Sequence, residues 1–122
     1  WEKCFDTVLP KLWLSWGGLS SIDTSNELFT DHYTGQDNVS YHRGDSWFWL
    51  NNLAALVLYR TNAAKYKQVI EKIIEASSHE ILELGAIGHH AEVSSARALS
   101  SRGCVSQAWS SAMFIELCNE LF

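Results

Sequence analysis

The chain has little proline, little cysteine and little charge. Of its 122 residues one is proline, three are cysteine and 19% are charged. Cys4, Cys104 and Cys118 are far apart and form neither a CxxC pair nor a ladder with histidines, which argues against a structural zinc site and a disulfide scaffold. An odd number of cysteines is typical of a reducing compartment, so we expect a cytoplasmic location.

The sequence also lacks long hydrophobic runs and an excess of positive charge. The apolar stretches at residues 47–59 and 108–118 are too short and too interrupted to span a bilayer, and no signal peptide is recognisable. Nine basic residues stand against 14 acidic ones, for a net charge of −5. Nucleic acids and anionic membranes require a basic face, so we expect neither as a partner.

Motifs of several enzyme classes are missing as well. There is no P-loop and no GxGxxG, which removes the usual signals for a nucleotide. The serines that follow Glu92 have no GxSxG context, which argues against a serine hydrolase. We therefore expect no cofactor.

Aromatic side chains, in contrast, are abundant. The chain holds six tryptophans and four tyrosines, and 47% of its residues are hydrophobic, which is typical of one globular domain. Planar rings stack on the C–H faces of sugars, but composition alone favours tryptophans that fill a core. The first residue is Trp1 and the only methionine is Met113, so we interpret the chain as a piece of a longer protein.

The pattern of apolar residues predicts an all-α fold. We predict four helices, at about residues 2–15, 45–60, 62–84 and 105–121. The first is expected to break or kink near Pro10, the second to begin at Asp45 or Ser46 as N-cap, and the third to run from an Asn62 cap to Gly85. Long loops occupy residues 16–44 and 85–104, and no segment alternates as a strand would.

The predicted helices differ in how much of their surface is apolar and must be buried against other helices. The third has one apolar stripe opposite a charged face; the stripe consists of Tyr66, Val69, Ile70, Ile73, Ile74, Ile81 and Leu84. The second and fourth are apolar nearly all round and need cover on several sides. This alternation predicts two hairpins of a larger α/α toroid, with apolar surface exposed if the chain is isolated. Both long loops would then meet at one mouth of the ring.

Glu92 is the leading candidate for catalysis. It is the only carboxylate in the stretch GAIGHHAEVSSARALSSRGCVSQAWSSA, within the second long loop. Hydrolysis of a glycosidic bond with inversion needs one carboxyl as acid and one as base, held roughly 6.5–9.5 Å apart. The alternative is a solvated loop glutamate or a helix cap. A metal site with His89 and His90 has weaker support, because no HExxH spacing accompanies them.

A second set of candidates surrounds the predicted start of the second helix. His42, Arg43 and Asp45 could bind sugar hydroxyls while Gly44 lets the backbone approach a ligand. The alternative is a capping turn, with Asp45 as N-cap and Arg43 paired with a loop acid.

Tryptophans in the first turns of two helices are further candidates. Trp47 and Trp49 are two residues apart, so on a helix they point in different directions and only one should line a pocket. Gln107 and Trp109 are also two residues apart, so again only one of them should face the pocket while the other fills the core.

Two segments resemble the glycogen debranching enzymes of bacteria and archaea, in their amylo-α-1,6-glucosidase domain. The run WGGLSSIDTSNELFTDHYTGQDNVSYHRGDSWFW from Trp16 is similar to a family segment that ends in YHxGxxWPW. EVSSARALSSRGCVSQAWSSA is similar to the segment with GCxxQAWS that closes that domain. The resemblance implies an (α/α)6 toroid, of which residues 1–122 form the C-terminal portion without a further domain boundary.

The resemblance also implies an activity and roles for individual residues. It implies hydrolysis, with inversion, of α-1,6-linked glucose at branch points of glycogen or maltodextrin, with Glu92 as general base. Five residues match family motif positions whose side chains would bind the glucan: Tyr41, His42, Trp47, Gln107 and Trp109. Arg43 and Asp45 lie within the first of these motifs and would bind the glucan as well. Phe48 stands where the family usually has proline, a departure that bears on substrate preference.

The general acid of the family has no counterpart in the chain. It would be supplied by the upstream part of the same domain or by a complementing chain. Three functions therefore stay open at the level of sequence: part of a debranching glucosidase, a non-catalytic glucan-binding segment, and another inverting toroid glucosidase or a sugar phosphorylase.

Overall fold

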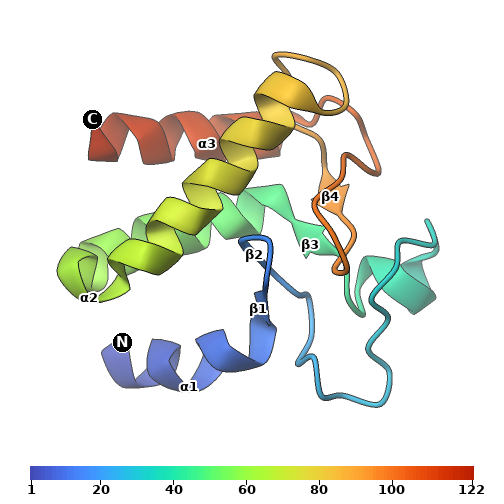
Figure 1. Cartoon of the computed structure of the whole chain (residues 1–122), viewed down its shortest axis with the longest axis horizontal. Coiled ribbons are helices and arrows are strands. Elements are labelled where there is room, and N and C mark those ends of the chain that lie inside the picture. The colour runs from blue at the N-terminus through green and yellow to red at the C-terminus, as the bar shows by residue number, and fades with distance from the viewer.

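The computed structural model describes residues 1–122 and is mostly helical, as predicted (Figure 1). Three α-helices, one short π-helix and four two-residue strands follow one another along the chain. Their bounds are α1 Glu2–Leu12, β1 Trp13–Leu14, β2 Gly18–Leu19, η1 Asp37–Tyr41, β3 Ser46–Trp47, α2 Phe48–Glu83, β4 Val93–Ser94 and α3 Ala108–Leu121.

The helices predicted at 45–60 and 62–84 are both present; together they carry the label α2 and meet at a sharp bend at Asn62. Asn62 has non-helical angles, φ −164° and ψ 86°. Its Oδ1 accepts a hydrogen bond from the backbone N–H of Lys65 at 3.1 Å, which caps the second half of α2. The predicted Asn62 cap is therefore confirmed. So is the stop at Gly85, which follows the C-cap Leu84 with a φ of 52°.

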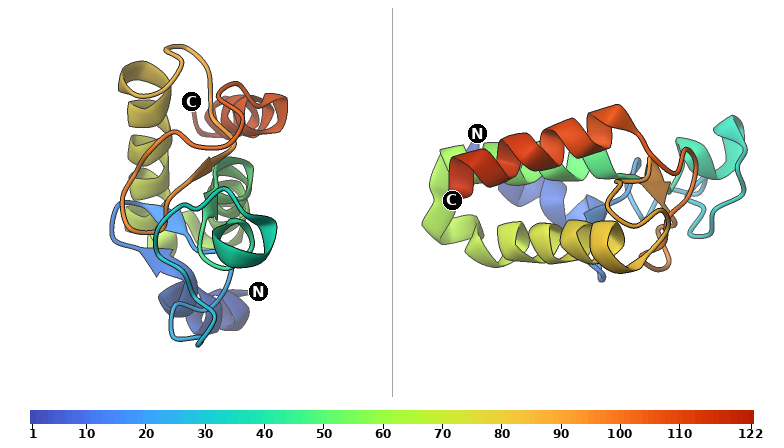
Figure 2. Two further views of the ribbon diagram at one scale, coloured as in Figure 1. Left: turned by 90° about the vertical axis from the view of Figure 1, so that its right-hand side faces the viewer. Right: turned by 90° about the horizontal axis from the view of Figure 1, so that it is seen from above.

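The bend turns α2 into a hairpin whose two halves lie side by side (Figure 2). α3 packs along the first half, and the shared core combines residues from both halves with one from α3. Its buried members are Ala55, Leu56, Leu58, Tyr66, Ile70, Ile73 and Leu117. The apolar stripe predicted for residues 62–84 is thus confirmed at its centre, where burial of apolar surface stabilises the hairpin.

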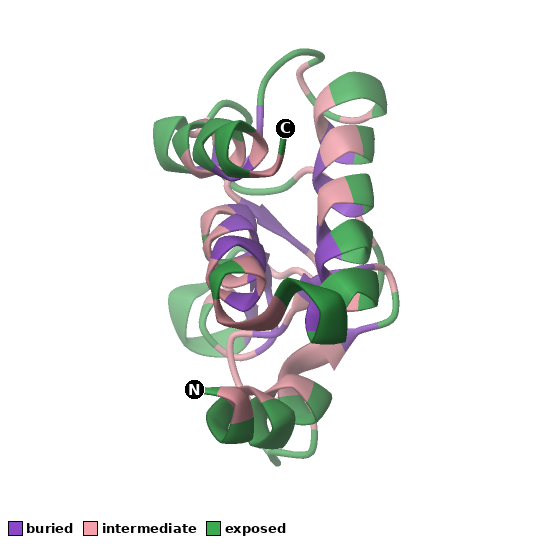
Figure 3. Ribbon diagram, turned by 90° about the vertical axis from the view of Figure 1, so that its left-hand side faces the viewer, coloured by how far each residue is buried: buried purple, intermediate pink, exposed green.

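The outer faces of α1 and α3 are largely uncovered (Figure 3). α1 has no buried residue, and α3 buries only Ser110 and Leu117. Large apolar side chains are exposed on and beside these helices, among them Trp1 at 85%, Trp109 at 65% and Ile115 at 59%. The expected exposed apolar surface is present. The expected cover of α3 on several sides is absent within this chain.

Short strands correct the prediction that the chain has none. β1 pairs with β2, and β3 pairs with β4, both antiparallel. The second pair joins the two long loops through Ser46–Ser94 and Trp47–Val93. Two-residue strands give no alternation of apolar and polar residues, so the sequence carries no signal for them.

The predicted helix starts need correction too. α2 begins at Phe48 with Trp47 as N-cap and no side-chain cap, so neither Asp45 nor Ser46 caps it. The Phe48 N–H instead donates to the Glu92 carbonyl oxygen at 3.2 Å. Pairing with the second long loop has replaced the local cap. α1 ends at Leu12, two residues after Pro10, and α3 begins at Ala108 rather than 105. None of the helices is both long enough and apolar enough for a membrane span.

The bend at Asn62 gives a test of the fold. Asn62→Ala removes the cap acceptor and should lower the free energy of unfolding by about 1 kcal/mol. Asn62→Ser keeps an oxygen that can accept the same hydrogen bond and should lose much less. Urea denaturation of both variants checks this, and equal stabilities would contradict the capping role.

Candidate active site

The two long loops meet at the ends of α2 and α3, as predicted (Figure 2). Besides the β3–β4 pair, Arg97 forms a two-pronged ion pair with Asp31, at 2.9 and 3.0 Å. The Arg97 backbone N–H and the Ser95 hydroxyl both donate to the Asp31 carbonyl oxygen. These contacts hold the first loop against the second and bring Tyr41 into the neighbourhood of Glu92.

The Glu92 carboxylate is half-buried and held at both oxygens. Gln107 Nε2 donates to Oε1 at 2.9 Å, and the backbone N–H of Cys104 donates to Oε2 at 3.1 Å. The amide of Gln107 is itself oriented, because the Ser110 hydroxyl donates to its Oε1 at 2.7 Å. Two fixed donors orient the carboxylate and leave lone pairs on both oxygens for a further donor.

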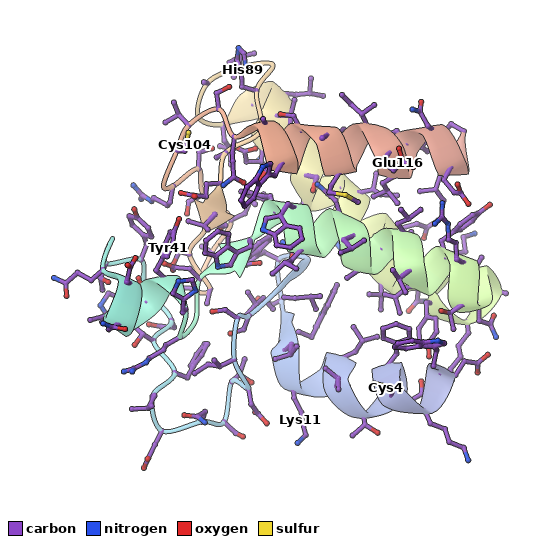
Figure 4. All side chains as sticks on the ribbon, turned by 180° about the vertical axis from the view of Figure 1, so that it is seen from behind. Cys4, Lys11, Tyr41, His89, Cys104 and Glu116 are labelled. Carbon is purple, nitrogen blue, oxygen red and sulfur yellow. The ribbon has the colours of Figure 1, made fainter.

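Three rings form a cluster beside Glu92. Tyr41 meets Trp47 edge to face, with ring centroids 4.5 Å apart, and His42 stacks on Trp47 at 5.5 Å. The indole N–H of Trp47 donates to the Tyr41 carbonyl oxygen at 3.0 Å. Burial raises the pKa of the Tyr41 phenol, and the neighbouring Glu92 carboxylate raises it further. Tyr41 therefore remains a neutral hydrogen-bond donor next to Glu92. Figure 4 shows it at the end of η1, on the side that faces the loop with Cys104.

An apolar hollow of about 890 Å³ adjoins this cluster. His42, Trp47, Trp49 and Trp109 line it, together with apolar residues of α1 and of the first half of α2. Glu92 is not in its lining. The next residue, Val93, pairs with Trp47, which is in the lining.

Trp47 and Trp49 both line this hollow, so the prediction that only one of them could do so is wrong. Trp47 lies in β3, at the N-cap of α2, with extended backbone angles, and the angular spacing of a helix does not apply to it. The ring of Trp49 meets that of Trp109 edge to face at 6.3 Å. Gln107 turns to Glu92 while Trp109 is exposed, so neither of these two fills a core.

Asp45 is fully buried. Its Oδ2 accepts a hydrogen bond from the Ser40 hydroxyl at 2.8 Å, and its Oδ1 has no partner. Burial raises the pKa of this carboxyl above its ordinary value of 3.8. The side chain supports the turn at η1 from within.

The neighbours of Asp45 also differ from the prediction. Gly44 faces the carbonyl group of Thr30, where a Cβ would have no room, so its close approach is to the chain itself and not to a ligand. Arg43 forms no ion pair; its carbonyl oxygen accepts the N–H of Thr30 at 2.6 Å. The alternative in which Arg43 pairs with a loop acid is therefore wrong.

The side chains of the adjacent residues His89 and His90 lie in different environments, one exposed and one buried. His90 is buried and contacts the carboxylate of Glu80, with Nδ1 at 2.6 Å from Oε2. His89 lies at the outer tip of the loop after α2 and contacts Ser106 (Figure 4). A site built from both histidines and Glu92 does not form. The structure gathers no group of three or more His, Cys, Asp or Glu side chains that could hold a metal ion.

Two residues near the site were missed by the sequence analysis. Glu80 is a charged residue at a helical interval from Ile73 on the buried stripe, and a charge in that position signals a paired, buried group. Gly103 has a φ of 68°, and a Cβ there would collide with the Glu92 carboxylate. A glycine directly before Cys104, in a loop without helix signals, was the available cue.

Asp45 gives a pH-dependent test of the site. Below its ordinary pKa of 3.8 the carboxyl is neutral in both the folded and the unfolded protein. As pH rises, the unfolded chain loses this proton first, so ionisation favours unfolding. Asp45→Asn removes that effect, and its stability relative to the unchanged protein should rise as the pH increases above 3.8. Urea denaturation at several pH values measures the difference, and a constant or falling difference would contradict the burial effect.

Comparison with known proteins adds one finding. A family model described as amylo-alpha-1,6-glucosidase matches residues 2–116 of the chain. Among curated proteins no match is found. The matched range includes both long loops, Glu92 and the start of α3. The chain therefore belongs to the amylo-alpha-1,6-glucosidase family.

Proposed function

We propose that the chain is the C-terminal portion of an inverting glucosidase domain that removes α-1,6-linked glucose at branch points of glycogen or maltodextrin. The observation that carries this proposal is the Glu92 carboxylate, held by Gln107 and by the N–H of Cys104. Its neighbour Val93 pairs with Trp47, which lines the apolar hollow. Membership of the family supports the reaction class and a glucan substrate.

Glu92 acts in this proposal as the general base. It takes a proton from a water molecule, whose oxygen attacks the anomeric carbon from the face opposite the leaving oxygen. A carboxyl from outside the chain protonates that leaving oxygen as the C–O bond breaks. Because its two donors already orient the carboxylate, little reorganisation is needed when the water binds.

The aromatic residues supply the sugar-binding wall. Trp47 and Trp109 offer ring faces for the apolar faces of glucose, and His42 and Arg43 offer donors for its hydroxyl groups. Tyr41 donates near Glu92, where the attacking water would lie. Gln107 acts on the substrate through Glu92, and Asp45 acts by supporting η1.

We propose that the uncovered faces of α1 and α3 pack against the other helices of an (α/α)6 toroid, supplied by the upstream part of the domain or by a complementing chain. Their exposed apolar side chains support this. Three free cysteines support a cytoplasmic location.

Replacement of Glu92 tests the catalytic role. In an enzyme that contains this chain together with the rest of the glucosidase domain, Glu92→Gln should lower kcat on a branched limit dextrin by about 10²–10⁴-fold. Binding of the dextrin should persist, because the amide keeps the shape of the side chain. Glu71→Gln, on the exposed charged face of α2, serves as the matched control. Unchanged hydrolysis in Glu92→Gln would remove Glu92 as base and leave the glucan-binding function.

Gly103 tests whether the orientation of the carboxylate matters. Gly103→Ala should lower kcat by up to about a hundredfold, because its Cβ displaces the Glu92 carboxylate. Gly88→Ala is the matched control: Gly88 also has positive φ, at 83°, but nothing lies within 4 Å of its added Cβ. Both variants strain the backbone and should lose similar stability. Equal kcat in the two variants would show that the displacement has no effect on the reaction.

A further inference from the structure

A chain of buried polar side chains runs behind Glu92, through the interior of the α2 hairpin. The Ser77 hydroxyl donates to Asn52 Oδ1 at 2.8 Å, and Asn52 Nδ2 lies 3.2 Å from His90 Nε2. His90 Nδ1 lies 2.6 Å from Glu80 Oε2, and the Ser101 hydroxyl donates to Glu80 Oε1. Asn52, Glu80 and His90 have no solvent exposure.

The direction of these hydrogen bonds determines which nitrogen of His90 carries the proton. Because the Ser77 hydroxyl donates to Asn52 Oδ1, the other end of the amide, Nδ2, faces His90. An amide nitrogen only donates, so Nε2 of His90 accepts and its proton resides on Nδ1. That N–H donates to Glu80, which also receives the backbone N–H of Ala91 at 3.3 Å. Every donor and acceptor in this chain of contacts is satisfied, as burial requires.

The same residues hold the backbone that carries Glu92. The carbonyl oxygen of His90 accepts the backbone N–H of Gln107 at 2.8 Å, and Glu80 holds the N–H of Ala91. Gln107 is the residue whose side chain orients Glu92. A shift of His90 would therefore displace both the carboxylate and the amide that orients it.

We propose that Glu80 and His90 are positioning residues for Glu92: they fix residues 90–92 and Gln107 in the geometry that the reaction needs. This inference rests on the proposed role of Glu92 as base. Neither side chain lies at the surface, so neither touches substrate. Their effect is on the position of a catalytic group, and a change should appear in kcat more than in KM.

Three variants of Glu80, assayed in the enzyme that contains the whole glucosidase domain, separate geometry from charge. Glu80→Gln keeps an oxygen for His90 and Ala91, and its amide can donate to Ser101, whose hydroxyl rotates to accept. Glu80→Asp keeps the charge but its shorter side chain no longer reaches His90. Glu80→Ala removes the contact. We expect Gln to retain kcat within about threefold, Asp to lower it about tenfold and Ala about a hundredfold, each with KM within about threefold.

The ranking of the three variants by kcat tests the inference. If Glu80→Ala does not fold, as circular dichroism would show, the comparison of Asp with Gln remains. An Asp variant as active as the unchanged enzyme beside an inactive Gln variant would overturn the inference, because charge and not geometry would then matter. Unchanged kcat in both Asp and Ala variants would overturn it as well.

A second measurement does not depend on activity. Nitrogen-15 NMR of the histidine-labelled enzyme that contains the whole glucosidase domain should show the His90 proton on Nδ1, and the same tautomer in Glu80→Gln; a proton on Nε2 would overturn the inference. If Glu92→Gln were fully active, the proposed function would fall whatever the tautomer of His90. If Glu92→Gln were inactive while Glu80→Asp and Glu80→Ala kept their kcat, only this inference would fall.

Discussion

The backbone hydrogen bond from Phe48 to Glu92 is the contact on which the site depends. Together with the β3–β4 pair beside it, this bond starts α2 and at the same time holds the loop that carries the carboxylate. Neither segment has a regular structure long enough to hold its place alone, because two-residue strands contribute few hydrogen bonds. The two loops therefore stabilise each other. The loop with Glu92 caps the start of α2, and the loop before α2 places the aromatic cluster of Tyr41, His42 and Trp47 against the loop with Glu92.

The structure combines an apolar core with a polar one. Residues such as Leu58 and Tyr66 fill the α2 hairpin near its bend, while Asn52, Glu80 and His90 are buried farther from it. Buried ionisable groups contribute little net stability compared with apolar residues of the same volume. What they provide is a defined orientation, because each hydrogen bond is satisfied in one arrangement of the partners. The orienting contacts lie at the end of the hairpin that adjoins Glu92.

The sequence predicted those parts of the fold that depend on local chemistry. The mostly helical structure, the Asn62 cap, the stop at Gly85 and the buried stripe around Ile70 follow from helical periodicity and capping rules, and all are confirmed. The meeting of the two loops followed from their place before apolar helices. The start of α2 did not follow, because a partner distant in sequence replaces the local cap. Trp47 was misplaced for the same reason, since its strand exists only through β4. The Gln107 contact to Glu92 depends on a side-chain geometry that no pattern encodes.

The bend at Asn62 limits how the chain can change in length. Each residue of an α-helix turns the following ones by about 100°. A single insertion between Tyr66 and Ser77 would rotate Ser77 and Glu80 away from the face that Tyr66 buries, and the polar contacts at the open end of the hairpin would be lost. Residues 21–36 contain no helix or strand and follow no such angular rule. Insertions and deletions among homologous chains should thus collect in that stretch and be absent from the second half of α2.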